Sequence, residues 1–196
     1  MGKVVYITGA PATGKSTLCS ALTESASNID CFCYSERLRD YVNQQRGSLL
    51  DEIDIRRESA RSISAEDVQS VDELLLTESR VTRESARHLL IDSHPVTKED
   101  YGFRVTPFSD EDIRAMEVDV FVCLYADPHV LGARISANPQ GRPLPSPFEL
   151  ALHVQLQASV VAQYAVITGR PCYLLNSEIP RDELMQQVKR LLRLDV

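Results

Sequence analysis

The stretch Val4–Leu18, VVYITGAPATGKSTL, is the most informative part of this chain. Mostly β-forming residues lead into Gly9, and Gly14-Lys15-Ser16 follows five positions later, so the segment satisfies the pattern G-x-x-x-x-G-K-[ST] in full. Glycines allow backbone geometries that turn successive N–H groups toward an anion, and the N-terminus of a following helix adds its positive end. The stretch therefore predicts a strand, a phosphate-binding loop and a helix, in that order.

Each position of this loop has an expected role in holding a nucleoside triphosphate. Lys15 is expected to reach the β- and γ-phosphates, Ser16 Oγ to ligate Mg²⁺, and Thr17 to contact the α-phosphate. The loop backbone supplies further contacts. The predicted nucleotide-binding residues are Gly9, Ala10, Pro11, Ala12, Thr13, Gly14, Lys15, Ser16 and Thr17.

Composition sets outer limits on the protein class. A chain of 196 residues with 43% hydrophobic and 25% charged residues is typical of one globular domain. The net charge of −7 disfavours a general nucleic-acid-binding surface, although a local basic cleft stays open. No stretch approaches the length of a transmembrane helix, and the five cysteines are expected to be reduced, so we predict a cytoplasmic protein without a membrane partner. The sequence does not indicate the oligomeric state.

The hydrophobic pattern predicts an α/β fold. Short apolar runs without clean alternation are typical of parallel strands buried on both faces, and segments long enough for crossover helices separate them. We expect a three-layer sandwich with helices on both faces of a five-stranded parallel sheet. The predicted strands are Val4–Thr8, Cys31–Tyr34, Leu89–Ser93, Val118–Tyr125 and Pro171–Asn176; the clearest helices are Ala65–Arg87, Ser146–Thr168 and Pro180–Leu192.

Two segments look irregular. Asn138–Pro145, NPQGRPLP, and His94–Ser109 are both predicted to lie at the C-terminal side of the sheet. Open α/β sheets bind their ligands at that side, and long loops within such domains are usually functional. We therefore expect both segments to contribute to the site.

Asp92 favours a particular use of the phosphate loop. It ends the apolar run Leu89–Ile91, as expected for a carboxylate that holds Mg²⁺. It is followed by Ser93-His94 rather than by the Glu that motor ATPases usually carry, and the later strands lack an N-K-x-D-like guanine-binding motif. The sequence therefore favours ATP-dependent phosphoryl transfer to a small acceptor.

At this point the chain resembles archaeal-type adenylate kinases. The resemblance rests on the phosphate loop, Ile91–His94, Leu124–Pro128 with the following Arg134, and the segment QASVVAQYAVITGRPCYLLN. It implies a nucleoside-monophosphate-kinase fold in one domain, 1–196, with an acceptor-binding helical region at about 35–87 and a lid at about 138–145.

The resemblance also implies roles for single residues. Asp92 would hold Mg²⁺, and Arg134 would stack on the donor adenine or approach its phosphates. Arg142 would be the lid arginine that clamps the transferred group, and the loop after Asn176 would border the adenine. The lid has fewer basic residues than the family's, and Tyr34–Arg37 and the loop after Asp92 also differ, so the donor residues are the safer carry-over.

The acceptor side contains two possible sets of functional groups. A nucleoside monophosphate needs cations, which Arg37, Lys98 and Arg104 could supply, with help from Arg80 or Arg83. A hydroxyl acceptor needs a carboxylate base, for which Glu36 or Asp92 is available. His94 could contact the acceptor or the phosphates. Tyr101 and Phe103 could stack on an acceptor base, or they could hold the loop against the core.

We favour the monophosphate acceptor. A kinase for a nucleoside or other small alcohol is the first alternative, and a regulatory ATP-binding module is the second.

Overall fold

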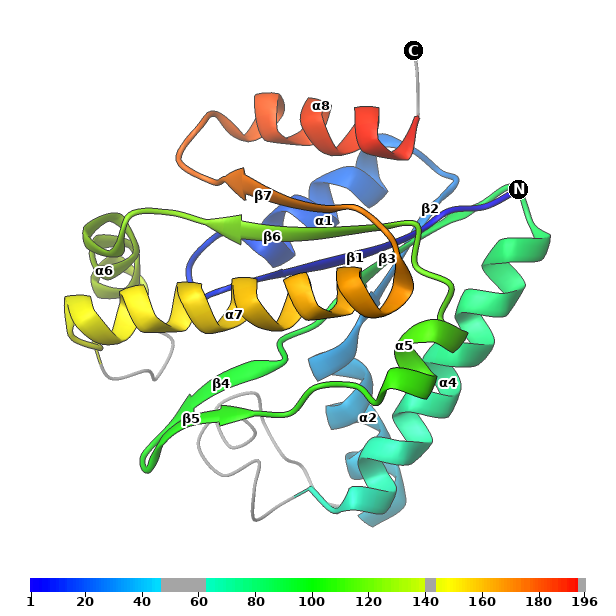
Figure 1. The fold of residues 1–196 in the computed structure, drawn as a ribbon, viewed down its shortest axis with the longest axis horizontal. Helices are drawn as coiled ribbons and strands as arrows, with labels where there is room; N and C mark the ends of the chain where they lie inside the picture. Colours follow the sequence, from blue (N-terminus) through cyan, green and yellow to red (C-terminus); the bar gives the residue numbers. More distant parts are fainter. Residues whose placement is uncertain (47–62, 140–143, 194–196) are drawn as a thin grey trace.

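A five-stranded parallel sheet forms the centre of the molecule (Figure 1). The computed structural model describes residues 1–46, 63–139 and 144–193. The strand order is β2-β3-β1-β6-β7, which confirms the predicted sheet, and each predicted strand boundary is right to within two residues. The strands are β1 (Val4–Gly9), β2 (Ile29–Cys33), β3 (His88–Asp92), β6 (Val120–Tyr125) and β7 (Cys172–Asn176).

Helices cover both faces of this sheet, as the α/β pattern predicts. β1 lies in the middle and is buried along its whole length, so its side chains alternate between two apolar cores. Val5 and Ile7 face α1 (Lys15–Ser25) and α8 (Arg181–Leu192). Tyr6 faces the other core, which is formed with α2 (Tyr34–Arg46), α4 (Ala65–Glu84), α5 (Asp110–Ala115) and α7 (Pro147–Thr168).

The long helix α7 begins and ends where its sequence says it should. Ser146 accepts from the Glu149 N–H, and the Glu149 carboxylate accepts from the Ser146 N–H, which completes a capping box before the first turn. Gly169 ends the helix in the left-handed conformation, at φ 66°. Between these two ends, α7 packs along one face of the sheet against β1 and β6 (Figure 1).

The length of α7 corrects the expectation that no stretch of the chain approaches the length of a transmembrane helix. The helix has 22 residues and an 18-residue window of mean hydropathy 1.3, so it is long and apolar enough to cross a membrane by length and composition alone. In this fold it buries Val161 and Tyr164 in the core and also buries the polar residues His153 and Gln157. The expected lack of a membrane partner stays a prediction.

The segment His94–Ser109 is more regular than its sequence suggested. Val96–Glu99 (β4) pairs with Gly102–Val105 (β5) in an antiparallel hairpin, and Gly102 adopts φ 130° beside the turn. Glycine tolerates that conformation because it has no Cβ. The expectation of an irregular loop is therefore wrong for these two strands, which form a small sheet of their own.

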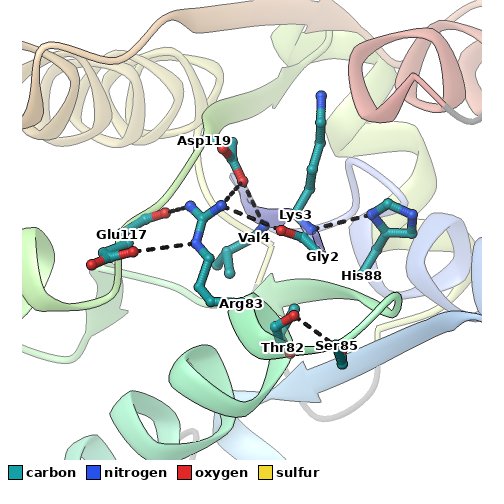
Figure 2. Close-up of polar contacts among 9 residues, drawn as sticks. All are labelled: Gly2, Lys3, Val4, Thr82, Arg83, Ser85, His88, Glu117 and Asp119. Atoms are coloured by element: carbon teal, nitrogen blue, oxygen red, sulfur yellow. Dashed lines mark hydrogen bonds and ion pairs between the residues drawn. The ribbon is translucent and has the colours of Figure 1, made fainter.

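Arg83 links the segments that lead into β1 and β6, at the amino-terminal ends of the strands (Figure 2). Its guanidinium pairs with the Asp119 carboxylate at 2.9 Å and donates to the carbonyls of Glu117 and Gly2. Asp119 Oδ2 also accepts from the Val4 N–H at 2.9 Å. Arg83 thus serves the amino-terminal ends of β1 and β6, far from the phosphate loop, so the suggestion that it helps to bind an acceptor is wrong.

Candidate active site

The predicted phosphate loop forms a tight turn between β1 and α1. The Thr13 N–H and Oγ1 both donate to the Ala10 carbonyl, at 3.3 and 2.8 Å. Ala12 and Gly14 adopt left-handed conformations at φ 64° and 82°. A Cβ on Gly9 would lie 2.7 Å from Thr13 Oγ1 and 2.8 Å from the Leu124 carbonyl oxygen, so only glycine fits there. No side chain caps α1, which leaves its first N–H groups available to an anion.

Lys15, Ser16 and Asp92 meet directly beyond this loop. β3 runs parallel to β1 with Asp92 opposite Ile7, so the carboxylate reaches the start of α1. The Lys15 ammonium pairs with Asp92 Oδ1, and Ser16 Oγ donates to Asp92 Oδ2 at 3.0 Å. The Lys15 and Asp92 side chains are only 3% and 2% exposed. Two oxygen ligands on adjacent elements are the donor set that Mg²⁺ prefers beside a triphosphate, so the predicted metal pair fits.

Arg134 joins the phosphate loop to the turn after β7. It lies on α6 (Pro128–Ala137), and its guanidinium donates to the Ala12 carbonyl at 3.2 Å and to the Ser177 carbonyl at 3.0 Å. Asn176 Oδ1 accepts from the Glu178 N–H at 2.9 Å, which shapes the same turn. The structure therefore places Arg134 and Asn176 together with the phosphate loop, on the side predicted for the donor nucleotide.

Glu36 and Arg37 lie in the first turn of α2, next to the carboxyl end of β2. Cys33 ends β2 opposite Asp92, so the exposed Glu36 lies at the same sheet edge as Asp92. Arg37 donates to Glu78 at 3.0 Å, and its guanidinium carbon lies 5.3 Å from the centre of the Phe32 ring. Both residues therefore lie at the carboxyl end of the strands, as Asp92 does, and their role toward an acceptor stays a prediction.

Three other predicted acceptor residues lie on the β4–β5 hairpin. Lys98 Nζ lies 3.4 Å from the Glu149 carboxylate, and Arg104 pairs with Glu99 at 3.3 Å. Tyr101 occupies the turn and is 90% exposed. Each of the three cations proposed for the acceptor, Arg37 included, thus pairs with a carboxylate in this structure.

Two other predicted site residues, His94 and Arg142, do not belong to this hairpin. His94 follows β3 by two residues and is half-buried. Arg142 belongs to positions 140–143 of the predicted lid, which lie outside the described residues.

α7 carries a buried polar group that was not predicted from the sequence. Gln157 and His153 are 0% and 3% exposed, and both contact the Val96 carbonyl; Gln157 also contacts Thr8. The i, i+4 spacing of His153 and Gln157 within the run LALHVQLQASVV was the available signal, because it puts both side chains on one face of the helix.

A second missed pair lies between α2 and α4. The Tyr34 hydroxyl donates to Asp72 Oδ1 at 2.7 Å. Burial raises the pKa of Asp72 to about 6, and the nearby Asp112 charge adds to the effect, although the Tyr34 hydrogen bond opposes it. A half-buried carboxyl that titrates near pH 6 therefore lies within the region predicted to bind the acceptor.

Comparison with known proteins identifies the family of the chain. A family model described as an AAA domain matches residues 5–147. The chain is 26% identical over 174 residues to an adenylate kinase from Methanothermobacter thermautotrophicus, which covers 85% of this chain and 86% of that protein.

Solved structures extend the comparison to the fold. A putative kinase from Chloroflexus aurantiacus superposes with a TM-score of 0.59 at 18% identity, covering 100% of this chain and 98% of that one. A sugar kinase from Janibacter superposes with a TM-score of 0.56 at 15% identity, covering 98% and 95%. The family model covers most of the chain and the solved kinases share its fold, so the chain belongs to the AAA domain family and has a fold found in known kinases.

Proposed function

We propose that this protein transfers the γ-phosphoryl group of ATP, with Mg²⁺, to a small acceptor. The observation that carries the proposal is the meeting of Lys15, Ser16 and Asp92 at the phosphate loop. Lys15 would neutralise the β- and γ-phosphates, while Ser16 and Asp92 would hold Mg²⁺. The metal would supply charge neutralisation on the phosphate oxygens when bound. Catalysis would then come mainly from positioning and electrostatic stabilisation.

Arg134 and the loop after Asn176 would form the donor-base side of the site. Arg134 already holds the phosphate loop and the turn after β7 in one arrangement, which fixes the two walls between which a nucleotide would lie. Arg142 remains the predicted lid residue that clamps the transferred group and helps to exclude water.

A nucleoside monophosphate is the acceptor that we favour. The adenylate kinase relative supports it, because the similarity covers most of both chains. Binding the acceptor phosphate would require Arg37, Lys98 or Arg104 to exchange its carboxylate partner for the phosphate. The Arg37 and Glu78 side chains are 50% and 38% exposed, and pairs this exposed are worth about 0–1 kcal/mol, so the exchange costs little.

A hydroxyl acceptor is the second candidate. One observation favours it: all three candidate cations are paired, while Glu36 lies exposed at the same sheet edge as Asp92. A carboxylate there could take the proton of an attacking hydroxyl. The Janibacter sugar kinase is a fold-level precedent for such an acceptor.

An acceptor screen with Glu36→Gln tests both candidates. ADP formation is measured with ATP and Mg²⁺, using nucleoside monophosphates, nucleosides and small alcohols as acceptors. With a hydroxyl acceptor, loss of the base should lower kcat by about 10²–10⁴-fold; with a monophosphate, kcat should stay within about threefold, because the acceptor oxygen is already anionic. Asp40→Asn is the matched control, since Asp40 is 66% exposed on the same helix. If no acceptor increases ADP formation, the proposal is wrong and the regulatory ATP-binding module is favoured.

A further inference from the structure

The β4–β5 hairpin depends on α7 for its position. It forms a two-stranded sheet separate from the main sheet, and such a hairpin is only marginally stable alone. Among the described residues, three side chains of α7 contact the hairpin. Gln157 Nε2 donates to the Val96 carbonyl at 2.9 Å, the His153 and Phe103 rings meet edge to face at 5.1 Å, and Glu149 pairs with Lys98.

Gln157 also reaches the last residues of β1. Its Oε1 accepts from Thr8 Oγ1 at 3.1 Å, and Thr8 directly precedes Gly9 of the phosphate loop. The amide orientation is fixed by chemistry, because the Val96 carbonyl only accepts and must therefore face the NH₂ group. One buried side chain thus bridges the phosphate loop and the entry to the hairpin.

Burying the Gln157 amide destabilises the folded protein unless both of its hydrogen bonds are made. Thr8 and Gln157 are both 0% exposed, and a buried amide that loses a partner pays the full desolvation penalty. An apolar side chain could fill the same space, but it would hold neither end. The bond pair therefore restricts where the hairpin can lie relative to the loop.

We propose that Gln157 is a positioning residue of the transfer reaction: through Thr8 and Val96 it fixes the hairpin that carries Lys98, Tyr101 and Arg104 against the phosphate loop. The inference rests on the proposed function, because it assigns these hairpin residues to the acceptor. Donor and acceptor would then be held at a set separation by a residue that touches neither.

His153 shares the same carbonyl. Its Nε2 lies 3.1 Å from the Val96 oxygen and 3.5 Å from Gln157 Nε2. A carbonyl oxygen has two lone pairs, so either side chain can hold Val96 when the other is removed. Loss of both should therefore be worse than the product of the two single losses.

The test compares Gln157→Met, His153→Phe and the double variant. Methionine keeps the length of glutamine without its polar atoms, and phenylalanine keeps a ring against Phe103. The control is Gln155→Met, an exposed position on the same helix. We expect each single variant to raise the acceptor KM by about threefold to tenfold, the double variant to raise it by more than the product, and the ATP KM to stay within about twofold.

Hydrogen exchange gives a second measurement that needs no acceptor. Amides of residues 96–105 should exchange faster in Gln157→Met and fastest in the double variant, whereas those of β6 and β7 should not change. If the wild type transfers phosphate but the variants keep both the acceptor KM and the hairpin exchange rates, the inference is wrong. If the wild type transfers phosphate to no acceptor, the proposed function fails, and the role of Gln157 in transfer falls with it. Faster hairpin exchange would then support only a structural bridge.

Discussion

The ion pair between Lys15 and Asp92 makes a sharp prediction about stability as well as turnover. Asp92→Asn removes the carboxylate but keeps the shape of the side chain. The Lys15 ammonium, 3% exposed, is then left in a buried place without its counter-charge. Breaking a buried pair by removing one partner costs about 3–5 kcal/mol.

This free energy converts into a measurable shift of Tm. For a chain of 196 residues, the entropy of unfolding near the midpoint is about 0.4 kcal/mol per kelvin. Asp92→Asn should therefore lower Tm by about 7–12 °C in differential scanning calorimetry without nucleotide. Asp182→Asn, at an exposed position on α8, is the control and should move Tm little.

The double variant Lys15→Met/Asp92→Asn separates the charge effect from packing. It leaves no buried ammonium and no buried carboxylate, so its Tm should return close to that of the wild type. Its turnover should remain abolished, because the phosphate and metal contacts are both gone. An Asp92→Asn variant that melted within about 2 °C of the wild type, or a double variant as unstable as the single one, would contradict the predicted cost of the unpaired Lys15 ammonium.

Two further predictions concern other parts of the fold. Gly2→Ala would place a Cβ against the backbone carbonyls of Thr82 and Arg87. It should therefore lower the free energy of unfolding, measured by urea titration, by about 1–3 kcal/mol and leave kcat of the folded enzyme unchanged. An unaltered urea midpoint would contradict this packing. Asp72 titrates near pH 6 in the folded state, above its ordinary value of 3.8, so the folded state holds a proton between about pH 4 and 6 that the unfolded chain has released. The contribution of Asp72 to stability should therefore fall as pH rises through that window, by an amount on the order of 1 kcal/mol after allowance for solvent screening. Asp72→Asn should flatten this fall and the exposed Glu73→Gln should not; equal slopes in all three proteins would contradict the assignment.

The sequence was most informative where backbone geometry and burial act locally. The strands could be predicted because runs such as Val4–Thr8 are short, rich in β-forming residues and apolar on both faces, as is typical of a covered parallel sheet. The start of α7 could be predicted because Ser146 and Glu149 form their capping box within one turn. The roles expected of Lys15 and Ser16 follow from their places in a motif whose spacing matches the turn geometry.

The hairpin was missed because its strands are short and polar. Val96–Glu99 and Gly102–Val105 bury few side chains of their own, so their hydrophobic pattern is weak and the position of the hairpin comes from contacts with a helix about fifty residues away. The wrong suggestion for Arg83 has a similar origin. Arg83 lies in the last turn of α4, and only the fold reveals which end of the sheet that turn reaches.

The sequence by itself determined that a glycine-rich loop with the phosphate-binding motif precedes the first helix of a parallel α/β sheet, and that Asp92 ends a buried strand. These features are encoded by neighbouring residues, through glycine conformations, caps and apolar runs. Only the tertiary structure decided that the Asp92 carboxylate pairs with Lys15, that Arg134 links the phosphate loop to the turn after β7, and that Gln157 bridges Thr8 and Val96. The physical reason is that these contacts join segments far apart in the chain, whose approach is set by strand order and helix packing rather than by local propensity.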